Sequence, residues 1–438
     1  MSPSPQAVAH ERAALTLSAL AFFFVLTAYY IVRPVRDQLS GAVGSTQLPL
    51  FYAGTFVVML LLTPLFGALV ARCPRKRLLS WIYSFFILCL FAFVPAFLAQ
   101  DRIGARTLGV VFFTWVSVFN LFVVSLFWSF MADIFDSVQA RRVFPLIALG
   151  GMAGAVFGPM VTSLLVGWLG VAPLLVVSAA MLGAALALLL RLSERHEQQY
   201  GSADDNEPIG GSLWAGVREL WTRPFLCYMA LLMLLNDGIG TLAYALVADY
   251  AKAHFAASAV RTAFYAHLDL AVNVLGALLQ LSLTRWILTR NGAGTGLVLP
   301  ALINVGLLVM VMLWGHAEIS WLGTTIPLLA IMLVVTRGFA YGMTKPAMDA
   351  LYTRVPRETR YKGKNFVETA VWRFGDLLVT SGVSGLGKLG MGVSGMALIG
   401  VGISSLAPWV ARQAGQSSDL LPEDELVVRA RDASPETP

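Results

Sequence analysis

The sequence contains few charged residues and few cysteines. Of its 438 residues, 13% are charged and 57% are hydrophobic, whereas about 25% are charged in a soluble globular protein. The polar residues are too few to cover a soluble domain, so the apolar residues must face lipid. The three cysteines, Cys73, Cys89 and Cys227, have no paired spacing, which excludes a disulfide framework and a zinc site.

Enzyme motifs are also missing from the chain. No HExxH, GxSxG or paired-cysteine pattern occurs, and the stretch GVSGLGKL at 382–389 has Leu389 where a P-loop needs serine or threonine. We therefore expect no enzymatic activity, no cofactor and no metal. The net charge of +6 is explained by basic cytoplasmic loops, so we expect no nucleic-acid partner.

Long apolar runs fill the chain instead. Twelve of them reach the roughly 20 residues that a helix needs to cross a bilayer, six on each side of a polar segment at 191–223. We expect an all-α integral membrane protein of about twelve transmembrane helices, with six-helix halves at 1–190 and 224–411, a cytoplasmic linker between them and a disordered tail at 412–438. The predicted spans are 13–32, 48–70, 79–99, 107–131, 143–167, 172–190, 224–250, 261–283, 295–314, 323–343, 365–386 and 392–411.

Lysine and arginine indicate the orientation of the spans. With both termini placed in the cytoplasm, 22 of the 31 basic residues fall in cytoplasmic loops and tails, as the positive-inside rule requires. We expect a multi-pass monomer in the lipid bilayer of the bacterial inner membrane, with both termini cytoplasmic.

Polar residues at the end of the first span form the first candidate site. Charges in hydrocarbon cost roughly 2.5–3.5 kcal/mol each unless a partner or a cavity compensates them. Tyr29, Arg33, Arg36 and Asp37 share one helical sector, provided that Pro34 does not turn the chain. They form either an anion clamp, because arginine binds carboxylate or phosphate bidentately, or an interfacial cluster whose side chains snorkel to the membrane surface.

The seventh span carries a second candidate site. Asn236 and Asp237 precede Gly238 and Gly240, which is the pattern of a broken helix that lines a substrate site or a gate. A packing kink is the alternative interpretation.

The eighth and tenth spans add further polar residues. In the tenth, Arg337 is the best candidate for a charge in a buried cavity, and Tyr341 and Lys345 follow it at spacing four. In the eighth, His267 and Asp269 straddle one residue and point to different faces, so we do not favour a proton relay there.

The eleventh span begins with basic residues and continues with paired charges. Lys364 and Glu368 are four apart, and Arg373 and Asp376 are three apart, so each pair can form a local ion pair. A self-neutralised structural network is the alternative to a binding role.

Two six-helix halves joined by a cytoplasmic linker resemble the major facilitator superfamily, whose halves expose a central site alternately. The loop GALVARCPRKR is similar to that superfamily's inter-helix motif, and the glycines of the fifth span are similar to part of its antiporter motif. For these glycines we favour the simpler interpretation that small residues four apart let helices approach closely. They are Gly150, Gly151, Gly154 and Gly158, followed by Pro159.

Three stretches also resemble the ATP:ADP antiporter, or nucleotide translocase, family of bacteria and plastids. They are YYIVRPVRDQL at 29–39, SLFWSFMAD at 125–133 and RYKGKNFVETAVWRFGD at 360–376. The resemblance implies a twelve-helix exchanger, related to the major facilitators, whose basic residues hold nucleotide phosphates. By position, the resemblance implies that Arg36 replaces a lysine that family members tend to have before Asp37. Lys362 and Lys364 would match the family's basic pair before the eleventh helix, and Arg373, Gly375 and Asp376 would match its Arg-x-Gly-Asp signature.

The fourth and seventh helices depart from that family. Its nucleotide exchangers usually have a glutamate in each, whereas 107–131 has only Asn120 and the seventh helix has Asp237 in a different setting. We therefore expect a divergent relative whose substrate need not be ATP or ADP.

These observations predict a secondary active transporter that moves an organic anion by alternating access, above all a nucleotide or another phosphorylated metabolite, with exchange as one mode. A proton-coupled carrier of a non-nucleotide solute is the alternative, and it stays open because the acids in the spans outnumber the arginines. A receptor is disfavoured because the linker and tail are short. The predicted substrate-binding residues are Arg33, Arg36, Asn120, Asn236, Arg337, Tyr341, Lys362, Lys364 and Arg373, and the predicted coupling or gating residues are Asp37, Asp237, Glu368 and Asp376.

Overall fold

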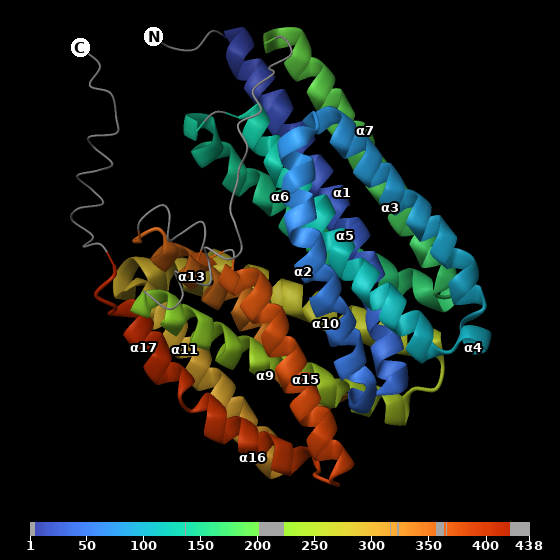
Figure 1. Ribbon diagram of the computed structural model, residues 1–438, viewed down its shortest axis with the longest axis vertical. Helices are drawn as coiled ribbons and strands as arrows, with labels where there is room; N and C mark the ends of the chain where they lie inside the picture. Colours follow the sequence, from blue (N-terminus) through green and yellow to red (C-terminus); the bar gives the residue numbers. More distant parts are fainter. Residues whose placement is uncertain are drawn as a thin grey trace. The chain divides into compact units, whose positions relative to one another are not determined.

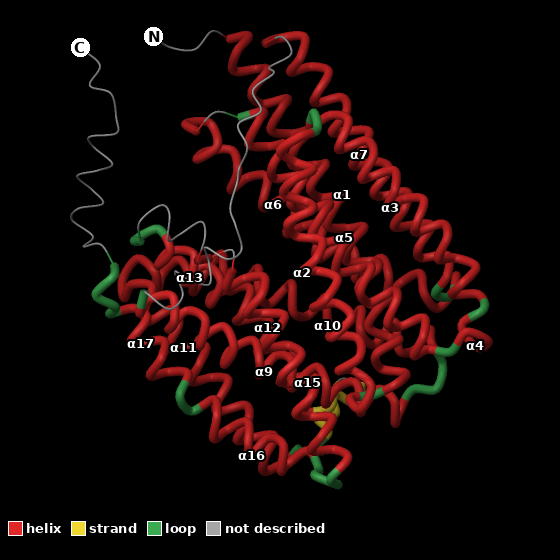
Figure 2. Tube along the Cα trace, viewed as in Figure 1, coloured by secondary structure: helices red, strands yellow, loops and turns green. Residues whose placement is uncertain are grey.

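The computed structural model describes residues 5–135, 137–200, 223–315, 317–321, 324–355, 363–364 and 366–420. Nearly all of these residues are helical (Figure 1), apart from turns and one short antiparallel hairpin, drawn in yellow in Figure 2. The helices of the first half are α1 (Pro5–Val43), η1 (Ser45–Gln47), α2 (Leu48–Arg72), α3 (Arg75–Leu98), α4 (Gln100–Ile103), α5 (Ala105–Ile134), α6 (Ser137–Leu169) and α7 (Ala172–Tyr200).

The second half contains both α-helices and short π turns. Its elements are α9 (Pro224–His254), α10 (Ser258–Leu279), η2 (Gln280–Thr284), α11 (Arg285–Trp314), β1 (Glu318–Trp321), β2 (Thr324–Pro327), α12 (Leu328–Phe339), η3 (Ala340–Thr344), α13 (Lys345–Tyr352), η4 (Val367–Val371), α15 (Trp372–Lys388), α16 (Val393–Ser404) and α17 (Ala407–Gly415). In the hairpin, Glu318 of β1 is paired with Pro327 of β2.

Ten helical segments of the described chain are long and apolar enough to cross a membrane. One of them, Ser258–Trp314, is 57 residues long and holds two predicted spans, which part at Gly292, where the φ of 79° suits glycine. The eleventh predicted span contains η4 and α15, which the ten segments do not include. Together these elements account for the twelve predicted spans and confirm an all-α membrane fold.

Contacts divide the chain into two compact units. The first unit comprises Met1–Gly210 and Ala248–Asn273, and the second comprises Gly211–Val247 and Val274–Pro438. The predicted linker at 191–223 begins inside a helix, because α7 extends to Tyr200. Residues 201–222, and residues 421–438 of the predicted tail, lie outside the described residues.

The core of the first unit is rich in aromatic side chains. Helix α1 packs against α5, α6 and α7, and these helices lie side by side in Figure 1. The rings of Phe86 and Phe119 meet edge to face, with centroids 5.2 Å apart, and Phe22 stacks on Phe127 at 4.5 Å. Because apolar helices gain little from leaving lipid, this close packing supplies much of the association energy.

The glycines of α6 let α1 approach closely. A Cβ atom at Gly150 would lie 2.4 Å from the carbonyl oxygen of Ala19, and one at Gly154 would lie 2.2 Å from that of Phe23. Thr27 of α1 also donates a hydrogen bond of 3.5 Å to the carbonyl oxygen of Gly154. The packing interpretation of these small residues is therefore confirmed.

Replacing Gly154 with valine is expected to destabilise the first unit by roughly 1–3 kcal/mol or more, because the new side chain would overlap the α1 backbone. Thermal unfolding in detergent measures this as a lower melting temperature. The matched control is Gly167→Ala on the same helix, where no atom lies within 4 Å of the added methyl group. A variant G154V as stable as G167A would contradict the close approach.

The second unit has a separate core. Helix α11 packs against α16 and α17, and the buried side chains include Leu297 and Ala301 of α11 together with Val410 and Ala411 of α17. The twelfth predicted span consists of two helices, α16 and α17, separated by a turn after Ser404.

The helix interruptions lie at positions other than the predicted one. Helix α9 is continuous from Pro224 to His254, so the expected break at Asn236–Gly240 is wrong. Gly238 instead provides room for α15, because a Cβ atom there would lie 3.3 Å from Val379. In the second unit the π turn η3 follows Arg337 and the π turn η4 precedes Arg373, and such turns are common at functional sites.

Candidate functional site

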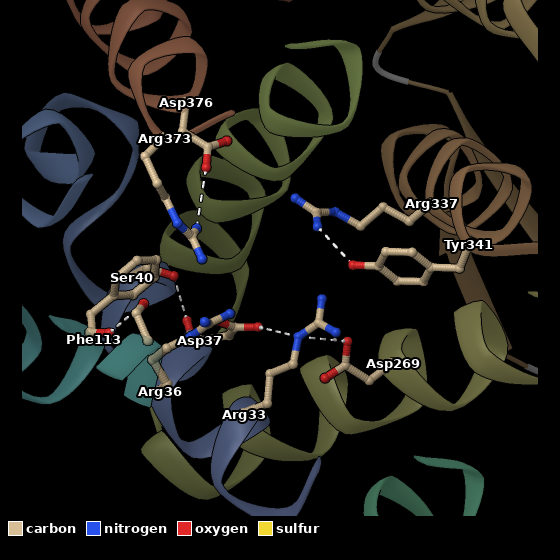
Figure 3. Close-up of polar contacts among 11 residues, drawn as sticks. Arg33, Arg36, Asp37, Ser40, Phe113, Asp269, Arg337, Tyr341, Arg373 and Asp376 are labelled. Carbon is tan, nitrogen blue, oxygen red and sulfur yellow. Dashed lines mark hydrogen bonds and ion pairs between the residues drawn. The ribbon is translucent and has the colours of Figure 1, made fainter. Parts of the chain in front are cut away.

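Four charged side chains of the first unit form what we call the α1 cluster: Arg33, Arg36, Asp37 and Asp269 (Figure 3). Helix α1 continues through Pro34, so the first three share one stretch of helix as predicted. The Nε atom of Arg33 lies 3.5 Å from Asp269 of α10 and 4.0 Å from Asp37. The Nε atom of Arg36 donates a hydrogen bond of 2.7 Å to Asp37.

The charges of the α1 cluster balance one another. Asp37 and Asp269 are 2% and 6% exposed and Arg33 is 7% exposed, so each needs an opposite charge. His267 is exposed, in contrast to Asp269, so the two do point to different faces as predicted. The sequence did not identify Asp269 as the partner of Arg33, because the two lie far apart along the chain.

Aromatic rings hold both arginines of this cluster. The guanidinium carbon of Arg36 lies 4.5 Å from the centre of the Phe113 ring, and that of Arg33 lies 5.5 Å from the Tyr30 ring. Cation–π contacts of this kind fix the planar guanidinium group and leave its edge for anions.

Four charged side chains of the second unit form what we call the α9–α15 cluster: Asp237, Arg337, Arg373 and Asp376. Asp376 is buried and the other three are half-buried. Arg337 donates a hydrogen bond of 3.3 Å to the hydroxyl group of Tyr341, one turn later on the same segment (Figure 3), and its guanidinium carbon lies 5.9 Å from the Tyr244 ring. The spacing of four between Arg337 and Tyr341 therefore brings the two side chains into contact.

Asp376 is held on both of its carboxylate oxygens. The hydroxyl group of Thr241 donates a hydrogen bond of 2.6 Å to one oxygen, and Arg373 lies 3.5 Å from the other. Asp376 is 4% exposed, and a buried carboxylate needs hydrogen-bonding and charged partners of this kind. The predicted local pair of Arg373 and Asp376 is present, and Thr241 is a member of the site that the sequence did not indicate.

Asp237 connects α9 to the same set of charges. Its carboxylate forms a hydrogen bond with the Trp372 side chain, and it interacts electrostatically with Asp376, Arg337 and Arg373. The cluster thus contains two arginines and two aspartates, and its formal charge is zero. One carboxylate, that of Asp376, is bound to two side-chain donors, whereas Asp237 is half-buried and bound by one.

The neighbouring Asn236 has an unused hydrogen-bonding capacity. It is 7% exposed, and neither its amide nitrogen nor its amide oxygen has a hydrogen-bond partner among the described residues. A buried amide without partners is costly, and such a group at a candidate site indicates contact with a ligand or with water.

Of the predicted basic residues before the eleventh span, the structure describes Lys364, which does not belong to the α9–α15 cluster and lies in a partly exposed network of ion pairs. Lys364 is 2.8 Å from Asp349 and 3.9 Å from Glu368, so the predicted pairing with Glu368 is present. Lys345 also pairs with Asp349 and Glu368, which gives two positive and two negative charges. Lys362 lies outside the described residues.

Two remaining expectations concern Asn120 and metals. Asn120 lies half-buried on α5 of the first unit and is not part of the α1 cluster. Within the described part of the chain, no group of three or more histidine, cysteine, aspartate or glutamate side chains could hold a metal ion.

Both clusters place arginines beside aspartates. A guanidinium group can bind a carboxylate or a phosphate bidentately, but here each arginine already faces an aspartate. An anionic solute can therefore bind only by competing with an aspartate, or when a proton neutralises that aspartate.

Solved transporter structures have a similar fold. The chain matches a bacterial homologue of iron transporter ferroportin in an inward-facing state with a TM-score of 0.65 and 15% identity, over 94% of this chain and 100% of that one. It matches the nucleoside transporter NupG with a TM-score of 0.61 and 13% identity, over 92% and 98%. A bacterial homologue of the human lysosomal transporter Spinster gives 0.59 and 13%, over 96% and 100%. Identities this low show the fold alone.

The family assignment rests on the sequence match. No functionally curated protein matches the chain, and the resemblance to ATP:ADP antiporters finds no support among these matches. The Major Facilitator Superfamily model, however, matches residues 15–367, most of the chain. With this match and its helical membrane fold, the chain belongs to the major facilitator superfamily and is a secondary transporter rather than an enzyme.

Proposed function

We propose that this transporter carries a small organic anion across the bacterial inner membrane by alternating access, and that the α9–α15 cluster binds the anion. The observation that supports this proposal is the placement of Arg337 beside the Tyr341 hydroxyl group, the Tyr244 ring and the Asp237 carboxylate inside the membrane-spanning second unit. A charged side chain within a membrane segment is costly, and such side chains commonly mark solute pathways.

The balanced charge of the cluster limits how the anion enters. Two arginines face two aspartates, so a bound anion adds uncompensated negative charge unless a proton arrives with it or another anion leaves. Transport is therefore either coupled to protons or an exchange of anions.

Nucleotide exchange is the first of these modes. It is supported by the resemblance of 29–39 and 360–376 to ATP:ADP antiporters. A nucleoside triphosphate carries several negative charges. The positive charge of Lys364 is already compensated by its ion pairs with Asp349 and Glu368, so it is not available to bind them. This balance favours a monoanion or dianion, such as a nucleoside monophosphate or a carboxylate, over a triphosphate.

Proton coupling is the second mode. It is supported by Asp237, which shares its site with Asp376 and has fewer donors than Asp376. Of the coupling residues expected from the sequence, Asp237 is the better candidate than Glu368, because Glu368 pairs with two lysines.

Purified protein in liposomes tests the proposal. We expect uptake of radiolabelled nucleoside monophosphates or small carboxylates, stimulated either by an inward proton gradient or by the same anion loaded inside. Uptake that needs only an internal nucleotide identifies exchange, and uptake that needs only the proton gradient identifies symport. Accumulation of neutral solutes with no uptake of any anion would disprove the anion proposal.

Replacing Asp237 with asparagine tests the coupling residue. The amide cannot bind a proton in the physiological range, so we expect uptake driven by a proton gradient to fall by roughly tenfold or more while exchange of internal for external anion continues. The matched control is Asp349→Asn, in the half-exposed lysine network of the same unit. An Asp237→Asn variant that is driven by a proton gradient like the unaltered protein would assign coupling elsewhere.

We also propose that both termini are cytoplasmic and that the protein works as a monomer. The distribution of 22 of 31 basic residues on one side supports the orientation. Labelling of single cysteines near each terminus from inside and outside the cell tests it.

A further inference from the structure

Residues 248–273 belong to the first unit by contact and to the second half by sequence order. They comprise the end of α9, the turn at Phe255–Ala257 and most of α10, and both helices continue from there into the second unit. Arg261 holds the turn closed by donating hydrogen bonds of 2.7 and 2.6 Å to the carbonyl oxygens of Phe255 and Ala256. Arg261 thus fixes the turn that joins the two helices of this hairpin.

Two side chains of the hairpin bind the main chain of the turn between α1 and α2. The carboxylate of Asp249 accepts a hydrogen bond of 2.7 Å from the backbone N–H group of Ser45, where η1 begins. Lys252 donates a hydrogen bond of 3.0 Å to the carbonyl oxygen of Val43, where α1 ends. An acid at a helix start and a base at a helix end both complement the local dipoles, so the two charges act together.

Gly44 makes this grip possible. Its φ of 78° is unfavourable for other residues. A Cβ atom at this position would lie 2.8 Å from the Asp249 carboxylate and 2.9 Å from the Lys252 side chain. The turn is therefore shaped to admit both side chains of α9.

Further contacts extend the attachment along α1. The ring of Tyr265 packs on Gly41, where a Cβ atom would lie 2.8 Å from it. The Arg33–Asp269 ion pair lies farther along the same two helices, and Asn273 donates a hydrogen bond of 2.8 Å to the carbonyl oxygen of Ala155 on α6. Polar contacts thus run from one end of the hairpin segment to the other.

We propose that residues 248–273 form a releasable latch. It is closed when the side chains of Asp249 and Lys252 bind the Val43–Ser45 turn, and open when these hydrogen bonds break. In the orientation proposed above, this turn lies on the outer side of the membrane. For the solute to reach its site from outside, the hairpin must separate from α1. The hydrogen bonds of the latch determine how frequently this separation occurs. The inference rests on alternating access but not on the identity of the solute.

Labelling of a buried cysteine measures the release of the latch without any substrate. Ser45 is 2% exposed, so Ser45→Cys, in a chain whose three native cysteines are replaced by serine, reacts with a membrane-impermeant maleimide only when the hairpin has moved away. In intact cells we expect Asp249→Asn to raise the labelling rate roughly tenfold, since it weakens a half-buried charged hydrogen bond. Lys252 is exposed, so Lys252→Met should raise the rate only about two- to threefold.

Two controls accompany the labelling. Thr46→Cys, at an exposed position of the same turn, should react at the same rate in every background. Asp101→Asn removes an exposed acid of α4 in the first unit and should leave the labelling of Cys at position 45 unchanged. Unchanged labelling in both the Asp249 and Lys252 variants would overturn the proposal.

Cross-linking gives an independent test on the functioning protein. A short bifunctional thiol reagent that joins Ser45→Cys to Asp249→Cys replaces the latch by a covalent bond, so we expect anion uptake to be lost and to return on reduction. The matched pair Gln38→Cys and Gln100→Cys, whose native side chains are 3.1 Å apart within the first half, should transport normally when cross-linked. Full transport by the protein cross-linked at positions 45 and 249 would overturn the latch, and absence of transport before cross-linking would count against the solute proposal instead.

Discussion

Replacing Arg337 with alanine is expected to lower the initial rate of anion uptake by roughly 30-fold or more. The guanidinium group of Arg337 binds the Tyr341 hydroxyl group and interacts with Asp237. A hydrogen bond made by a charged group contributes about 1.5–3 kcal/mol, and 1.4 kcal/mol is a factor of ten. Uptake into liposomes at matched protein content measures the loss.

The control for this prediction separates binding from folding. Because Arg337→Ala alone leaves Asp237 with less compensation, the variant can also lose stability. The double variant Arg337→Ala with Asp237→Asn removes one charge of each sign, so we expect its melting temperature to recover while uptake stays low. Arg290→Ala, at an exposed arginine of α11, should retain full uptake. Recovery of uptake in the double variant would contradict a direct role of Arg337 in anion binding.

Replacing Arg33 with glutamine is expected to destabilise the protein by about 3–5 kcal/mol, because it leaves Asp269 buried without its cation. Thermal unfolding in detergent would show a markedly lower melting temperature. The double variant Arg33→Gln with Asp269→Asn should recover most of the loss, since two neutral amides can share a hydrogen bond.

An exposed ion pair of the same unit provides the comparison. Arg142 and Glu11 lie 3.4 Å apart, and the Arg142 side chain is 68% exposed. Surface pairs contribute at most about 1 kcal/mol, so Arg142→Gln should change the melting temperature little. If the Arg33 and Arg142 variants lost equal amounts of melting temperature, burial of the α1 cluster would not determine how much its ion pairs contribute to stability.

Local pairs of the candidate site were predictable because helix geometry alone places them together. Residues three or four apart on a helix are neighbours, and this rule correctly predicted the pairs Arg373–Asp376 and Lys364–Glu368. The contact between Arg337 and Tyr341, also four apart, follows the same rule. None of these predictions needed knowledge of how the helices pack.

Long-range partners were not predictable for the corresponding reason. Asp269 pairs with Arg33 and Thr241 binds Asp376, although nothing in their local sequence indicates these contacts. The glycines near Asp237 suggested a broken helix, but α9 is continuous, and Gly238 lies where a neighbouring helix approaches it. Local pattern cannot distinguish a glycine that breaks a helix from one that admits a neighbour.

The sequence by itself determined the solvent, the fold class and the set of charges that can matter. A low content of charged residues requires lipid, and twelve apolar runs require a helical bundle, because a backbone in hydrocarbon must satisfy its own hydrogen bonds. Tertiary structure alone decided which charges face each other, where π turns interrupt the helices and how residues 248–273 grip the first helix. These features depend on contacts between segments that are distant in sequence, and in a membrane such contacts are selected by close packing and charge pairing rather than by hydrophobic pattern.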